Sequence, residues 1–230
     1  MRKGTKDRIV EAAIDLFNES GVSTVTTNHI ATHLGISPGN LYYHFANKEE
    51  IVREAFERMN AEADALWKID ARDAEVDRNI LQRIVIGNLR LYTRYIFFAR
   101  ELTSLLHEDK VLRERYANVA SRRMDQLMEV LRPMVAAGLL KNIDDDDDLR
   151  ALAEIAWMIG LFCVPYAEAT LVGPSPGRSA KARDARIRAA LERGALLVLN
   201  LFKPYLDELG YTALVVLVRS ELEKASEQTL

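Results

Sequence analysis

Residues 38–45, PGNLYYHF, concentrate hydrogen-bonding and aromatic side chains on one short predicted helix. At about 100° per residue, Leu41 and Phe45 lie about 40° apart and form its inward edge. The other side chains are small, polar or aromatic and point outward or to the flank: Gly39, Asn40, Tyr42, Tyr43 and His44. An amide binds an adenine edge bidentately, a tyrosine ring contacts thymine methyl groups, and glycine lets a backbone approach closely. This pattern suits the major groove of DNA, although one tyrosine packing on a neighbouring helix is an alternative reading.

Groups that bind phosphate are predicted on either side of this helix. Thr27 and Asn28 begin the preceding helix, where free backbone N–H groups favour an anion. Lys48 begins the following helix and adds a positive charge. Basic residues also form an N-terminal arm that could follow the DNA backbone or enter a minor groove: Arg2, Lys3 and Lys6. The alternative for this arm is an ordinary solvated cluster.

Two other patterns could suggest chemistry, and we assign neither of them a site. His29 and His33 have the i, i+4 spacing of metal ligands, but no carboxylate or cysteine accompanies them. Clustered carboxylates at Asp144–Asp148 suit a hard cation, yet the glycine and downstream glutamate of an EF-hand loop are missing. We interpret this run as a solvated helix start. No ordering of Ser, His and Asp or phosphate-binding glycine loop indicates catalysis, so we expect no catalytic residue, metal or cofactor.

Capping residues predict the helices that position the outward set. The predicted N-caps are Thr5, Thr27, Ser37 and Asn47, the last resembling a capping box with Glu50. Gly21 and Gly35 follow the first two helices as C-terminal glycines. Two short helices joined through Gly35 have the length and turn glycine of a helix-turn-helix.

The rest of the chain predicts longer helices, at about 77–106, 109–137, 149–171, 183–208 and 211–226. No alternating strand pattern accompanies them, so the expected fold class is all-α. A formal net charge of −3 argues against a protein that coats nucleic acid and leaves room for a small reading head. Cys163 is the only cysteine, which excludes an intrachain disulfide. Without a signal peptide or an apolar run of about 18 residues, we expect a cytoplasmic protein.

The segment TTNHIATHLGISPGNLYYHFANKEEIV, residues 26–52, resembles the DNA-binding segment of TetR-family transcriptional regulators. The shared features are the Thr–Thr opening, the IA..LG helix, LYYHF, and a lysine three residues after the phenylalanine. The family often has Arg or another residue where this chain has Asn28. Together with Ser37, the residues that the resemblance implies at the DNA are Thr27, Asn28, Gly39, Asn40, Tyr42, Tyr43, His44 and Lys48. The resemblance implies a DNA-binding domain over 1–50 and a helical effector-binding and dimerisation domain over 51–230.

Dimerisation also follows from the length of the reading helix, because one helix contacts only about four or five base pairs. Two copies about one helical turn (~34 Å) apart read a near-palindrome. We expect a self-complementary interface made by helices 149–171 and 183–208 in a four-helix arrangement. The second helix shows a stripe at helical spacing, although part of it could be intrachain core: Ile187, Leu191, Gly194, Val198 and Leu201.

An effector pocket is predicted where bulky apolar residues mix with a few polar groups. The candidates are Tyr92, Arg94, Tyr95, Trp157, Phe162 and Tyr166, each with plain core as the alternative. The leading hypothesis is a homodimeric repressor released from a palindromic operator in double-stranded DNA by a small hydrophobic ligand. The alternative is an all-α ligand carrier or protein-interaction module without sequence-specific DNA binding.

Overall fold

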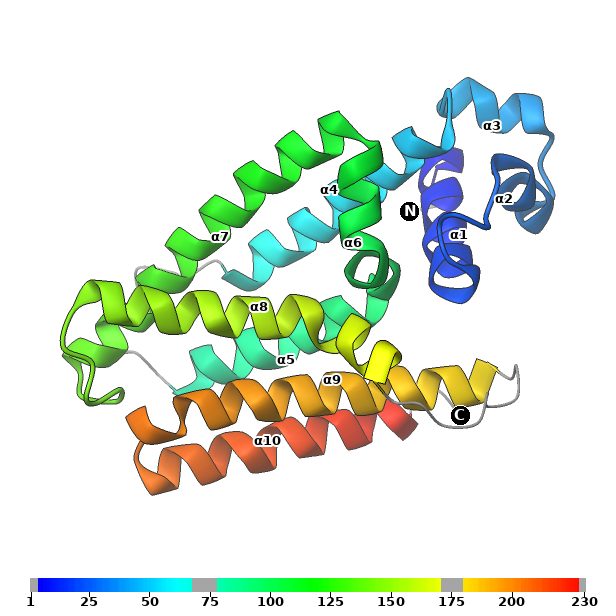
Figure 1. The fold of residues 1–230 in the computed structure, drawn as a ribbon. Helices are drawn as coiled ribbons and strands as arrows, with labels where there is room; N and C mark the ends of the chain where they lie inside the picture. The colour runs from blue at the N-terminus through cyan, green and yellow to red at the C-terminus, as the bar shows by residue number, and fades with distance from the viewer. Residues whose placement is uncertain (1–3, 68–77, 171–179, 228–230) are drawn as a thin grey trace. The chain divides into compact units, whose positions relative to one another are not determined.

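The computed structural model describes residues 4–67, 78–170 and 180–227. These residues form α-helices and one short 3-10 helix, without a strand, which confirms the all-α prediction (Figure 1). The helices are α1 (Thr5–Ser20), α2 (Thr27–Leu34), α3 (Pro38–His44), α4 (Lys48–Trp67), α5 (Arg78–Arg94), α6 (Ile96–Glu108), α7 (Lys110–Ala136), α8 (Asp146–Thr170), α9 (Ala180–Phe202), η1 (Lys203–Tyr205) and α10 (Glu208–Glu227).

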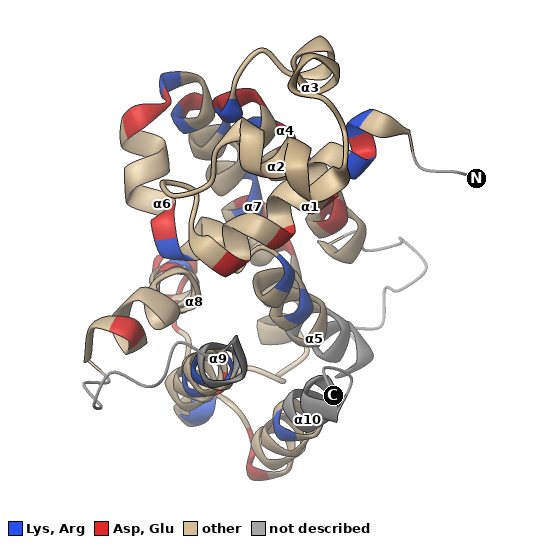
Figure 2. Cartoon of the chain, turned by 90° about the vertical axis from the view of Figure 1, so that its right-hand side faces the viewer, with Lys and Arg blue, Asp and Glu red and all other residues tan. Residues whose placement is uncertain are grey.

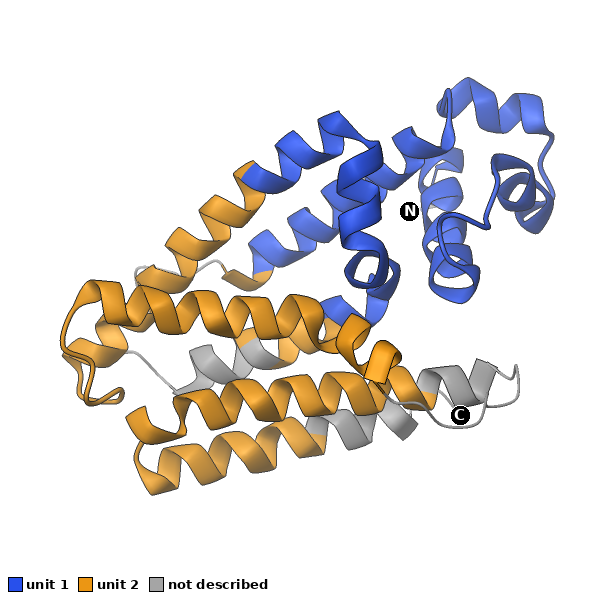
Figure 3. Cartoon of the chain, in the orientation of Figure 1, with its two compact units in different colours: residues 1–65, 91–117 blue, residues 66–90, 118–230 orange. Residues whose placement is uncertain are grey.

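Residue contacts divide the chain into two compact units, coloured in Figure 3. Unit 1 comprises residues 1–65 and 91–117, and unit 2 comprises residues 66–90 and 118–230. Unit 1 therefore contains α1–α3 together with most of α4, all of α6 and the start of α7. This division follows packing, whereas the predicted boundary at residue 50 concerns the roles of the two parts and stays a prediction.

The helix ends of the N-terminal region differ from the predicted caps by one residue at two places. Gly4 rather than Thr5 is the N-cap of α1, without a side-chain hydrogen bond. The hydroxyl of Thr26, not Thr27, accepts the N–H of His29, whose imidazole accepts the Thr26 N–H in return. A reciprocal pair of this kind satisfies two backbone donors, which explains why the helix starts one residue earlier. Ser37 caps α3 and Pro38 occupies its first turn, as predicted.

The predicted single helix over 77–106 is wrong, because the helix is interrupted at Tyr95, between α5 and α6. Tyr95 has φ −114° and ψ 36°, outside the helical region. The side chain of Asn18 in α1 fits into this break. Its amide donates to the Arg94 carbonyl at 2.8 Å, and its oxygen accepts the Phe97 N–H at 3.1 Å. A distant side chain thus satisfies the backbone groups that the interruption leaves open.

Aromatic rings fill much of the core of unit 1. Phe17 of α1 lies 5.3 Å from Phe97 of α6, between ring centroids, and Phe56 of α4 stacks on Phe98 at 5.1 Å. All four rings are almost completely buried. Aromatic pairs at these separations add attraction to the burial of apolar area, so they fix α1 and α4 firmly against α6.

In unit 2, α9 packs along both α8 and α10. Gly194 of α9 meets Cys163 of α8 so closely that an added Cβ would lie 2.6 Å from the cysteine Cβ and Sγ atoms. Leu191 and Ile187, one and two turns before Gly194, are buried within the same chain. For these residues the stripe predicted on helix 183–208 is therefore intrachain core, the alternative that its periodicity left open.

Among the described helices, α8 alone is long and apolar enough to cross a membrane, judged by length and composition. Only 22% of its most apolar window is buried within the chain. One such helix is a weak indication of a membrane span. Its outward apolar residues lie on one face, at spacings of three and four: Ile155, Met158, Phe162 and Tyr166.

Candidate nucleic-acid interface

The predicted helix-turn-helix is present as α2, a turn at Gly35 and α3. Gly35 has φ 65°, a left-handed conformation that ends α2 and is easiest for glycine. The hydroxyl of Ser37 accepts the Asn40 N–H at 3.2 Å and starts α3. Leu41 and Phe45 are 0% and 3% exposed, so they anchor the inward edge of the helix as expected.

The opposite side of α3 carries uncovered aromatic rings. Tyr43 is 85% exposed and Tyr42 is 50% exposed. Gly39 and Asn40, in the first turn of α3, are exposed as well. His44 is half-buried and makes an edge-to-face ring contact with Tyr43 at 5.1 Å. The alternative for one of them was packing on the first or fourth helix, but Tyr43 is largely uncovered and Tyr42 is bonded through its hydroxyl to Thr27 of α2. Exposed aromatic and amide groups on one helix are free to meet base edges and thymine methyl groups.

The hydroxyls of Thr27 and Tyr42 are hydrogen-bonded at 3.0 Å. This bond joins the first turn of α2 to the outward side of α3. Asn28, beside Thr27, is exposed. Only one of the two hydroxyls uses its proton in this bond, so the other can still donate to a phosphate oxygen.

Lys48, the predicted phosphate anchor at the start of α4, is bound to the loop between α1 and α2. Its ammonium donates to the Val22 carbonyl at 2.6 Å, which leaves two of its three N–H groups for other acceptors. The side chain of Asn47 accepts the Glu50 N–H, and the Glu50 carboxylate accepts the Ala46 N–H. The predicted capping box is present with its second bond displaced by one residue.

Acidic groups are absent from the sequence around this surface. Residues 20–48 contain no Asp or Glu, and Lys48 is their only Lys or Arg. Figure 2 shows α2 and α3 without charged segments, in contrast to α1 and α4. Residues 20–48 therefore add no negative charge that would repel a polyanion, and their specificity depends on hydrogen bonds and shape.

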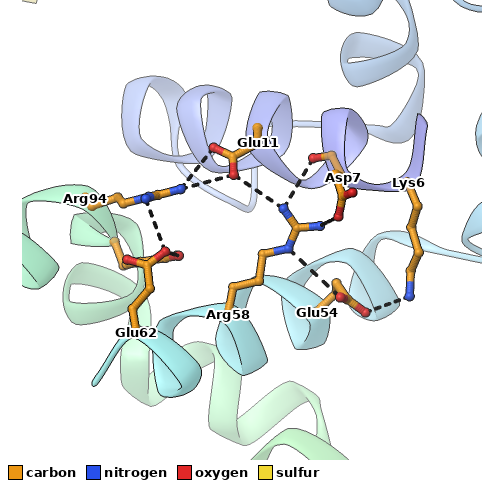
Figure 4. A network of polar contacts seen from close by, with 8 residues as sticks. Lys6, Asp7, Glu11, Glu54, Arg58, Glu62 and Arg94 are labelled. Atoms are coloured by element: carbon orange, nitrogen blue, oxygen red, sulfur yellow. Dashed lines mark hydrogen bonds and ion pairs between the residues drawn. The ribbon is translucent and has the colours of Figure 1, made fainter. Parts of the chain in front are cut away.

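A network of ion pairs joins α1 to α4 and to Arg94, at the end of α5 (Figure 4). Arg58 contacts Asp7 at 2.7 Å and Glu11 at 3.4 Å, with Glu54 at 4.0 Å. Arg94 contacts Glu11 and Glu62, both at 3.1 Å. Lys6 of the predicted basic arm pairs with Glu54 at 2.9 Å, and Arg2 and Lys3 lie outside the described residues.

Two family models match this chain. Residues 9–55 match the model described as bacterial regulatory proteins, tetR family, and residues 58–214 match one described as bacterial transcriptional repressor. The second match alone spans more than half of the chain. The chain belongs to the TetR family. Its members are DNA-binding transcriptional regulators, so α2 and α3 are the helix-turn-helix of a repressor.

Individual TetR-family relatives agree. The negative regulator IcaR of Staphylococcus epidermidis is 44% identical over 52 residues, 23% of this chain and 28% of IcaR. The regulator TtgR of Pseudomonas putida is 25% identical over 166 residues, 68% of this chain and 78% of TtgR. A TetR-family regulator from Marinobacter aquaeolei of known structure is 26% identical, with TM-score 0.79, covering 95% of this chain and 99% of that one.

His29 and the aspartate run of this TetR-family chain have structural roles, whereas His33 is exposed. The His29 imidazole caps α2 through Thr26. Asp145 accepts the N–H groups of Asp147 and Asp148 at the start of α8. Arg132 forms a two-point bond with Asp146 and lowers the pKa of that carboxyl below its ordinary value. These contacts match the predicted solvated helix start.

The six residues predicted to bind an effector fall in both units. Tyr92, Arg94 and Tyr95 belong to unit 1, where Tyr95 is buried and its hydroxyl donates to Glu62 at 2.8 Å. The other three belong to α8 in unit 2: Trp157, Phe162 and Tyr166. Phe162 and Tyr166 share the exposed face of α8, while Trp157 is about 140° or more around the helix from both. Their assignment to one pocket stays a prediction.

Proposed function

We propose that this TetR-family protein is a homodimeric repressor that acts in the cytoplasm and is released from a near-palindromic operator by a small, hydrophobic effector. Residues 1–50 would bind DNA, and residues 51–230 would dimerise and bind the effector. The observation that carries the DNA-binding part is the exposed aromatic and amide face of α3, with Tyr43 85% exposed. A soluble chain gains nothing by leaving two adjacent tyrosines uncovered unless a partner meets them.

We assign base contacts to the outward side of α3 and phosphate contacts to its surroundings. Asn40 and Tyr43 face away from the core, where an amide can pair with adenine and a ring can pack on a thymine methyl group. Thr27, Tyr42 and Lys48 present hydroxyl and ammonium groups to the DNA backbone. The remaining members of the proposed set are Asn28, Ser37, Gly39 and His44.

For the dimer we propose that the outward face of α8, flanked by α9, covers the same face of a second copy. This face exposes Ile155 by 40%, Met158 by 52%, Phe162 by 45% and Tyr166 by 57%. Leu197 of α9 adds another exposed apolar side chain, at 43%. A two-fold axis brings such a stripe against itself and removes it from water.

The proposed effector site lies in the helical region 51–230. Its support is chemical: the aromatic and apolar residues of α8, with Trp157 on the side away from the exposed stripe, suit a hydrophobic ligand. The effector acts only if it binds the released geometry more tightly than the DNA-bound one.

The test is the affinity of the full-length protein for a duplex that it selects from a random-sequence pool. We expect Asn40→Ala and Tyr43→Ala to lower the affinity for the selected duplex by about 10-fold, with little change for a scrambled duplex. Lys48→Ala should weaken binding to both duplexes and lower the salt slope by about 1. Wild-type affinity in all three variants would contradict the proposed interface, and failure to select any duplex would favour the ligand-carrier alternative.

A further inference from the structure

The loop between α1 and α2 is held in place from α6. The Glu101 carboxylate accepts the Val22 N–H at 2.8 Å. The Val22 carbonyl accepts a hydrogen bond from the Lys48 ammonium at 2.6 Å. The two hydrogen bonds use the donor and the acceptor of one residue of the loop. Val22 is only 5% exposed, so its N–H has no ready replacement from water if Glu101 is removed.

Other contacts also join the end of α1 and the loop that follows it to α6. The side-chain oxygen of Asn18 accepts the N–H of Phe97 in the first turn of α6, and Arg100 of α6 donates to the Asn18 carbonyl at 3.4 Å. Residues 18–22 therefore contact one side of α6 repeatedly. All of these residues lie in unit 1.

Gly21, the residue before Val22, also lies close to Glu101 of α6. Gly21 has φ 81°, a backbone conformation that residues other than glycine rarely adopt. A Cβ added at Gly21 would lie 3.0 Å from the Glu101 carboxylate oxygen, a tight contact that glycine avoids. The end of α1 and the first residues of the loop are thus shaped to meet Glu101.

We propose that Glu101 is a positioning residue for DNA binding. It holds the Val22 peptide in the place where the Val22 carbonyl can direct the Lys48 ammonium toward a DNA phosphate. Glu101 itself would make no contact with DNA, because a carboxylate would repel the phosphate backbone. The inference rests on the proposed role of Lys48 at the DNA. It adds that α6 is part of the DNA-binding apparatus, although α6 lies outside residues 1–50.

Electrostatics alone and positioning predict opposite effects of removing Glu101. A lost negative charge near DNA should raise the affinity, whereas a lost anchor for Val22 should lower it. Using the selected duplex, we expect Glu101→Ala to lower the affinity of the full-length protein by about 10-fold. Glu101→Gln keeps an acceptor oxygen for the Val22 N–H, and it should stay within about twofold of wild type.

Glu108→Ala is the matched control, because it removes the same charge from the same helix and Glu108 accepts instead from Ser104. It should bind the duplex as wild type does, or slightly more tightly. If Glu101→Ala does not fold, Glu101→Asp replaces it, since aspartate keeps the charge and is one methylene too short to reach Val22. Thermal unfolding of each variant establishes that the assay temperature lies below its midpoint.

A double-mutant cycle with Lys48→Ala identifies the route. Because Glu101 acts through the residue that holds Lys48, Glu101→Ala should cost little further affinity once Lys48 is gone. Affinity losses that multiply, or a Glu101→Ala variant that binds as tightly as wild type, would overturn the role of Glu101. An unchanged Lys48→Ala would instead remove Lys48 from the interface, and this route with it, so the two failures are distinguishable.

Discussion

The hydroxyls of Thr27 and Tyr42 lie 3.0 Å apart, and this one bond limits the directions in which both side chains point. At the scale of single residues, the candidate interface consists of such groups held by neighbours. Ser37 is bound to the Asn40 N–H, and Lys48 is bound to the Val22 carbonyl. Pre-positioned side chains lose less conformational freedom on binding, which favours affinity from few contacts.

These residue-level bonds mark where sequence reasoning ends. The helical period of 3.6 separates the inward Leu41 and Phe45 from the outward tyrosines, because periodicity depends only on neighbours along the chain. It does not predict the bond between Thr27 and Tyr42 or the one between Lys48 and Val22, because each joins residues at least 15 positions apart. Such pairs depend on how helices pack.

Tyr95 gives a prediction for pH. Burial and the hydrogen bond to Glu62 raise the pKa of its hydroxyl well above the ordinary value of 10.0. In the unfolded chain the group ionises near pH 10, whereas in the folded chain it stays neutral. The free energy of unfolding should therefore fall as the pH rises above 10, because only the unfolded state releases this proton.

Tyr95→Phe isolates the contribution of this hydroxyl. At neutral pH the variant should be less stable by about 1–3 kcal/mol, because a hydrogen bond to a charged partner is lost. Above pH 10 the difference between the two proteins should shrink. Urea denaturation from pH 7 to 11 measures it, and a difference independent of pH would contradict the assignment.

At the scale of helices, the break at Tyr95 shows why one boundary escaped prediction. No glycine or proline lies between residues 88 and 108, so helical periodicity runs through the interruption. What stops the helix is Asn18, which lies 76 residues before Arg94 and bonds both sides of the break. Caps made by residues close in sequence, such as Ser37, were predictable because donor and acceptor share one turn.

Two glycines should respond oppositely to alanine. Gly194→Ala places a methyl group 2.6 Å from Cys163, so α8 and α9 must separate and the chain should lose about 1–3 kcal/mol of stability. Gly39→Ala meets nothing within 4 Å in α3, so stability should stay equal or rise by up to about 1 kcal/mol. Thermal unfolding of the two variants checks this, and equal midpoints would contradict the close packing of α8 on α9.

At the scale of the whole molecule, the family predicts a dimer and the exposed face of α8 predicts where it forms. Periodicity identified the residues that share a helix face but could not distinguish intrachain from interchain neighbours. In α9 the buried Ile187 and Leu191 have an intrachain role, whereas in α8 Met158 and Phe162 have no intrachain cover comparable to theirs. The structure of one chain separates the two cases by what it leaves exposed.

Phe162→Glu tests this interface. A carboxylate at the centre of the proposed two-fold contact would face its own copy, and we expect a monomer by light scattering after gel filtration. Val216→Glu is the matched control, since Val216 is 62% exposed on α10 and outside the proposed interface. It should remain a dimer. A monomer from Val216→Glu together with a dimer from Phe162→Glu would move the interface to α10.

The single charged Lys or Arg over residues 20–48 has a consequence for how many copies of the protein a cell requires. A protein that binds mainly by neutralising phosphates binds DNA of any sequence, so most of its molecules occupy non-specific sites on the chromosome. With Lys48 as the only Lys or Arg in this stretch, arbitrary sequence should retain the protein weakly. A larger share of molecules would then stay available for the operator, so a small pool suffices to keep it occupied.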